Sequence, residues 1–191
     1  MREKLIVNVK SLWVGIGCQR GTSTQLLEKA IAQVFRENQL NQNAIAGIAT
    51  IDNKAKEPAL LEFCQLHNLA FKTFPAEVLR LVCVPNPAKL IEQTVGTPSV
   101  AEAAAMLAAA DINWLTQIID EILPLNPNAS HLTPTLTPVR VRCLVPKQIF
   151  RLPDEPGAVT IAVAQELTKI ASVIDPNSET QAKSGFLNFE F

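Results

Sequence analysis

A glycine-rich turn near the N-terminus is the strongest candidate for binding chemistry. The segment Gly15–Thr22 (GIGCQRGT) lies between a short apolar run and an amphipathic stretch. Such a turn gathers unpaired backbone N–H groups beside the positive end of the following helix and can therefore accept an anion. Arg20 adds a planar charge that can bind a carboxylate through two parallel hydrogen bonds. The segment predicts either a carboxylate-binding turn or a tight turn whose glycines serve only positive φ and close packing.

The spacing of the glycines argues against nucleotide binding. Gly15, Gly17 and Gly21 follow the pattern G-x-G-x-x-x-G. Dinucleotide-binding folds use G-x-G-x-x-G, and a phosphate-binding loop would carry a lysine before Thr22. A carboxylate is thus a better candidate ligand than a nucleotide phosphate.

Cys18 lies in the same turn, where a helix N-terminus could lower the pKa of a thiol and favour the nucleophilic thiolate. Neither His67 nor His131 has a sequence context that marks it as the base for that thiol. A small residue filling a crowded turn is the favoured interpretation. The four cysteines contain no C-x-x-C pair, so we expect buried thiols and no metal site.

Charged residues follow the second apolar run of the chain. Asp52, Lys54 and Glu57 would share a sheet edge with the glycine turn if the first two strands are parallel, and ligands bind at that edge in open α/β sheets. Lys54 could hold a second carboxylate, and Glu57 or Asp52 could act as a base. The alternative, which we favour for Glu57, is a solvated turn whose carboxylate complements the next helix dipole.

Glu102 is isolated in an alanine-rich segment, three residues after Ser99. That is the spacing of a capping box, in which each side chain bonds the backbone N–H of the other. Capping is the favoured explanation for both residues, and general-base catalysis by Glu102 is the alternative.

The elements that would position these residues follow from hydrophobic periodicity. Strands are predicted over 12–17, 44–51, 69–74, 139–145 and 159–164. Helices are predicted over 22–38 with Thr22 or Ser23 as its cap, and over 59–67, 75–82, 87–95 and 100–110, the last with a narrow apolar face. This order predicts a single three-layer α/β/α domain with a mixed sheet over 1–171. A loop is expected over 124–138, and 172–191 is expected to be a polar tail, either docked or disordered.

Composition argues against nucleic-acid-binding, secreted and membrane-spanning proteins. The 191 residues are 48% hydrophobic and 18% charged, and the net charge is −1. We expect a globular protein, with no basic stripe for nucleic acid. The N-terminus lacks the features of a secretory signal, and no apolar stretch reaches the ~20 residues of a membrane span. The expected location is cytoplasmic.

Four short blocks resemble the family formed by CobE proteins and the C-terminal domain of CbiG. The first, residues 15–22, resembles the signature G-I-G-C-R-x-G-T, with Gln19 as a departure. The second matches T-x-x-x-K-x-x-E at Thr50, Lys54 and Glu57, and the third matches S-V-[AS]-E-A-A-A over 99–105. The fourth pairs Lys147 with the strand 159–164. The stretch 148–157 and the loop 124–138 look longer than the connections of the family.

The resemblance implies a role in cobalamin (vitamin B12) biosynthesis, with a precorrin or cobalt-precorrin as ligand. A stand-alone domain would bind the intermediate as an accessory or carrier protein without a cofactor. The first alternative is a cobalt-precorrin-5A lactone hydrolase that releases acetaldehyde, and the second is a non-catalytic domain that docks onto another enzyme of the pathway. The expected binding residues are Gly15, Gly17, Cys18, Arg20, Gly21, Thr22, Thr50, Lys54 and Ser99.

Overall fold

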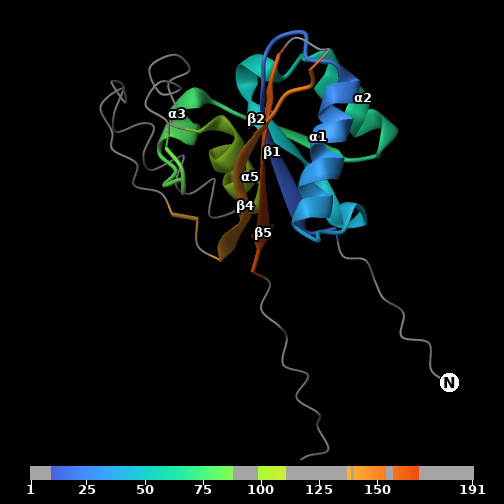
Figure 1. Ribbon diagram of the computed structural model, residues 1–191. Helices are drawn as coiled ribbons and strands as arrows, with labels where there is room; N and C mark the ends of the chain where they lie inside the picture. Colours follow the sequence, from blue (N-terminus) through green and yellow to red (C-terminus); the bar gives the residue numbers. More distant parts are fainter. Residues whose placement is uncertain (1–9, 88–98, 111–136, 139, 154–156, 168–191) are drawn as a thin grey trace, which may run out of the picture.

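A mixed five-stranded sheet forms the centre of the protein (Figure 1). The computed structural model describes residues 10–87, 99–110, 137–138, 140–153 and 157–167. The strands are β1 Leu12–Cys18, β2 Ile45–Ile51, β3 Ala70–Phe74, β4 Val141–Phe150 and β5 Val159–Glu166. They lie in the order β3-β2-β1-β5-β4, with β1, β2 and β3 parallel and β5 antiparallel to both β1 and β4. The predicted mixed sheet is confirmed.

Helices cover both faces of the sheet, which confirms the three-layer arrangement (Figure 1). The helices are α1 Thr24–Glu37, α2 Pro58–Leu66, α3 Ala76–Arg80 and α5 Val100–Ala109. Side chains alternate along a strand, so β1 directs Val14 and Ile16 toward α1 and α2. Its glycines face α5 on the same side as Trp13, and β5 contributes the small residues Ala162 and Ala164 to the buried cluster there. One face of the sheet is therefore bulky, and the other is nearly flat where α5 packs against it.

The flat face lets α5 pack directly on the backbone of β1. A Cβ atom on Gly15 would lie 1.8 Å from the carbonyl oxygen of Ala101 and 2.7 Å from the amide nitrogen of Ala105. Every residue of α5 is buried, so the prediction of a narrow apolar face was wrong. Alanine side chains are short enough for a helix to be enclosed on all sides.

A lysine from edge strand β3 completes the C-terminal end of α5. Lys72 Nζ donates a hydrogen bond of 3.1 Å to the carbonyl oxygen of Ala108 and lies 4.2 Å from the centroid of the Trp13 ring. A cation at this end complements the helix dipole, while burial lowers the pKa of Lys72. Sequence reasoning missed this contact because β3 carries no pattern that marks Lys72.

The helix after the first turn begins where the sequence predicts. Ser23 is the N-cap of α1, and its hydroxyl accepts a 3.0 Å hydrogen bond from Leu26 N. The apolar residues of α1 face the core as expected, at Leu26, Leu27, Ala30, Ile31, Val34 and Phe35. The first helix therefore starts at the carboxyl end of β1 and runs back along the sheet.

Strand β4 is longer than predicted. It continues through Pro146 to Phe150, so the first part of the stretch 148–157 belongs to the sheet. Proline is tolerated because β4 is an edge strand, and its pairing with β5 shifts register twice near this point. Those shifts interrupt the two-residue period on which the prediction relied.

Several predictions lie outside the described residues. These are nearly all of the helix 87–95, most of the loop 124–138 and the tail 172–191, so the domain boundary at 171 stays a prediction. Within the described part, no helix has the length and apolar character needed to cross a bilayer. The same residues contain no cluster of three or more His, Cys, Asp and Glu side chains suited to a metal ion.

Candidate functional site

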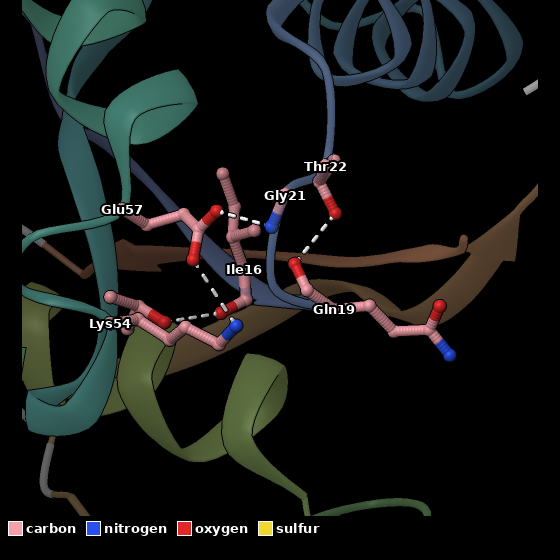
Figure 2. Close-up of polar contacts among 7 residues, drawn as sticks. Ile16, Gln19, Gly21, Thr22, Lys54 and Glu57 are labelled. Atoms are coloured by element: carbon pink, nitrogen blue, oxygen red, sulfur yellow. Dashed lines mark hydrogen bonds and ion pairs between the residues drawn. The ribbon is translucent and has the colours of Figure 1, made fainter. Parts of the chain in front are cut away.

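The turn after β1 and the turn after β2 meet through the carboxylate of Glu57 (Figure 2). One oxygen, Oε1, accepts a 2.8 Å hydrogen bond from Gly21 N, and the other, Oε2, lies 3.4 Å from Lys54 Nζ. Both side chains are largely buried, with Lys54 11% and Glu57 7% exposed. The predicted meeting of the two turns is found, but the prediction of a solvated Glu57 was wrong. The reason is a bond between residues 36 positions apart, which local patterns do not reveal.

Glu57 is also the N-cap residue of α2, although its side chain makes no capping hydrogen bond there. A glutamate is long enough to leave its own helix and reach the neighbouring turn. Pro58 at the first helical position has no N–H to offer. The carboxylate therefore serves the glycine turn instead of the end of α2.

The glycine turn itself contains an internal hydrogen bond. Thr22 Oγ1 donates a hydrogen bond of 2.8 Å to the carbonyl oxygen of Gln19, so Thr22 does not cap α1 (Figure 2). Gly21 has φ +74°, a left-handed conformation that favours glycine. Arg20 and Gln19 are exposed at the tip. Arg20 is thus presented outward beside an amide that is already bound to a carboxylate.

Cys18 lies next to this cluster at the end of β1. Burial raises the pKa of the Cys18 thiol above its ordinary value, the positive charge of Lys54 acts to lower it, Glu57 acts to raise it, and a hydrogen bond with Thr22 lowers it. The raised pKa keeps the thiol protonated at neutral pH. This agrees with the interpretation of Cys18 as a small residue in a crowded turn.

Other predicted site residues are used within the fold. Thr50 is fully buried, and its hydroxyl donates a hydrogen bond of 2.7 Å to the carbonyl oxygen of Ile16. This bond links β2 to β1. Gly15 and Gly17 face α5. Asp52 is exposed, and its carboxylate makes no side-chain hydrogen bond or ion pair with the described residues. The structure therefore brings together Cys18, Gly21, Thr22, Lys54 and Glu57, with Arg20 at the rim.

Ser99 and Glu102 form half of the predicted capping box. Ser99 Oγ accepts a 3.4 Å hydrogen bond from Glu102 N at the start of α5. The Glu102 carboxylate, fully buried, accepts instead from Asn86 N at 3.2 Å, Asn86 Nδ2 at 3.1 Å and Lys147 N at 3.1 Å. Lys147 Nζ in turn donates to the carbonyl oxygen of Asn86. The return half of the box was wrong because the backbone of β4 supplies a competing donor.

This second carboxylate is a structural tie between distant segments. Glu102 joins α5 to the segment around Asn86 and to β4, and its acceptors are occupied by three donors. A general base needs an accessible lone pair within reach of a substrate proton. The buried geometry of Glu102 therefore favours a positioning role over catalysis. An isolated acidic residue in an apolar helix was the sequence signal for it.

The fold and the cluster define a class of α/β/α domain with charged residues at the carboxyl edge of a mixed sheet. A family described as Cobalamin synthesis G C-terminus matches residues 12–164. The chain belongs to this family.

Two curated relatives carry the name cobalt-precorrin-5A hydrolase. The one from Priestia megaterium is 31% identical over 107 residues, covering 56% of this chain and 29% of the relative. The one from Salmonella typhimurium is 35% identical over 94 residues, covering 49% and 27%. The chain thus matches less than a third of the length of either relative.

Solved structures of the pathway share the fold. CobE, a protein from the cobalamin biosynthetic pathway, superposes with a TM-score of 0.59 at 25% identity, covering 83% of this chain and 95% of CobE. The cobalamin biosynthesis protein chiG from Agrobacterium tumefaciens superposes with a TM-score of 0.50 at 21% identity, covering 82% and 99%. The second likeness concerns the fold alone.

Proposed function

We propose that this domain binds a precorrin or corrin intermediate of cobalamin biosynthesis through the carboxylates of the macrocycle, as an accessory or carrier protein in the cytoplasm. The observation that carries the proposal is the cluster at the ends of β1 and β2. There a backbone amide and a lysine already hold a carboxylate, that of Glu57. Precorrins carry many acetate and propionate groups, and Arg20 stands exposed beside the cluster. Family membership supports the pathway.

The test is an absorbance titration of the purified protein with hydrogenobyrinic acid, repeated with Arg20→Ala. Removing a charge-assisted partner should weaken binding by about 1.5–3 kcal/mol, or roughly ten- to hundredfold. Arg36→Ala is the matched control, because Arg36 is an exposed arginine in the last turn of α1, away from the carboxyl edge of the sheet. Equal affinities of the Arg20 variant and the wild-type protein would remove Arg20 from the site.

A lactone hydrolase is the second candidate, favoured by the names of the two curated relatives. In that reaction a carboxylate would activate water for attack on the lactone, and Glu57 and Asp52 lie at the carboxyl end of β2. Catalytic release of acetaldehyde from cobalt-precorrin-5A would establish it. Substitution of the responsible carboxylate should abolish release while binding is retained. Docking onto another enzyme of the pathway would involve the tail 172–191, which lies outside the described residues.

A further inference from the structure

Glu57 occupies the position that a ligand carboxylate would need. Its two partners, Gly21 N and Lys54 Nζ, are an amide and an ammonium from different turns. Charge-assisted pairs of this kind are the usual means of binding a free carboxylate. The Glu57 side chain therefore shows that these two donors can bind a carboxylate.

The surroundings of Gly21 leave room for an incoming group. A Cβ atom on Gly21 would find no heavy atom within 4 Å, and the residue itself is exposed. The amide is thus bound on one side by a buried carboxylate while the turn is open to solvent on another. A ligand can approach this open side of the turn, where Glu57 is the side chain already bonded to the amide.

If a ligand carboxylate replaced that of Glu57, the number of hydrogen bonds made by the two donors would stay the same. The same two donors would remain satisfied, so the large penalty for leaving a buried lysine unpaired would not arise. The released Glu57 would remain at the N-cap position of α2, where the helix dipole favours a negative charge. The exchange therefore requires a side-chain rotation and no refolding.

We propose that Glu57 is a resident carboxylate, which a carboxylate of the ligand displaces from Gly21 and Lys54. The inference rests on the proposed function, because it assumes an acid-bearing ligand. Glu57 is then an internal competitor of the ligand. It keeps both donors paired in the free protein and lowers the affinity for the ligand carboxylate.

The first experiment uses acetate as the probe. Glu57→Ala vacates the position, so sodium acetate at about 0.1 M should raise the melting temperature of this variant by about 1–3 °C over sodium chloride of equal ionic strength. The wild-type protein should show no such difference. Glu62→Ala is the matched control, since Glu62 is an exposed glutamate of α2 bonded to Thr24. A folded Glu57→Ala variant that is indifferent to acetate would overturn the proposal. If that variant does not fold, Glu57→Ser, which also vacates the position, takes its place in the same comparison.

The second experiment measures the sign of the effect on the tetrapyrrole. Glu57→Gln keeps the shape of the side chain but removes its charge, so an internal competitor is weakened and hydrogenobyrinic acid should bind severalfold more tightly than to the wild type. Weaker binding would mean that Glu57 supports the site, and would overturn the proposal. Absence of binding to every form would contradict the proposed function, while the acetate result would still decide whether the donors accept an external carboxylate.

Discussion

Cys18 reports the charge balance of the cluster because Lys54 and Glu57 act on its thiol in opposite directions. Burial raises the Cys18 pKa, Lys54 lowers it and Glu57 raises it. Only the thiolate reacts with iodoacetamide, so the pH dependence of labelling follows this pKa. We expect Glu57→Gln to shift the labelling profile of Cys18 to lower pH and Lys54→Met to shift it to higher pH. Peptide mass spectrometry across about pH 7–10 measures both shifts.

Cys64 is the internal reference for that measurement. Burial alone raises its pKa to about 11, so neither substitution should change its profile. Shifts of Cys18 in the same direction for both variants would contradict the arrangement of charges around the turn.

The sequence predicted which residues flank the site but not how Glu57 is bonded. Lys54 and Glu57 were identifiable because polar residues directly follow a buried strand. The bond from Gly21 to Glu57 was not predictable, because periodicity reports which face of an element is apolar and does not report which loops meet. For the same reason, the sequence could not show that Asp52 is exposed while Glu57 is buried.

Helix α5 and strand β1 are matched through glycine. A side chain at Gly15 would collide with the backbone of α5 at Ala101 and Ala105, and backbone cannot rotate away as a side chain can. We expect Gly15→Ala to lower the free energy of unfolding by about 3 kcal/mol, the upper part of the range for overpacking. Urea denaturation followed by circular dichroism measures this loss.

Gly17 provides the comparison within the same strand. A Cβ atom there would make ordinary contacts of 3.7 Å with Thr160 and 3.9 Å with Val100. Gly17→Ala should therefore change the free energy of unfolding by less than about 1 kcal/mol. Similar losses for both variants would refute the close approach of α5 to Gly15.

The regular elements were predictable wherever one periodicity dominated. The strands β1 and β2 and the helix α1 carry clear runs, and their predicted and observed bounds differ by at most two residues. The bounds of α5 were also predicted to within one residue, but the prediction of its narrow apolar face was wrong, because alanine is short enough to be buried on every side and leaves no polar face to detect. The predicted strand was too short for β4, because Pro146 and the register shifts obscure an edge strand.

Across the molecule, Glu102 ties together segments that are distant in the sequence. Its carboxylate bonds Asn86, 16 positions earlier, and Lys147, 45 positions later. The bonds join α5, which covers one face of the sheet, to the segment around Asn86 and to the edge strand β4. Burying a carboxylate costs desolvation free energy. Removing it would cost more free energy, because its buried donors would be left unpaired.

Glu102→Gln tests whether this tie is structural or catalytic. A glutamine offers one oxygen and turns an N–H₂ group toward existing donors, so we expect the free energy of unfolding to fall by about 2–3 kcal/mol. Asn86 N and Lys147 N bond different oxygens of Glu102, Oε2 and Oε1, so amide hydrogen exchange should accelerate at whichever of the two amides faces the new N–H₂ group. Glu77→Gln, an exposed glutamate on α3, should change stability by less than about 0.5 kcal/mol. If the wild-type protein proves to release acetaldehyde, a Glu102→Gln variant that is as stable as the wild type but does not release it would instead assign Glu102 to catalysis.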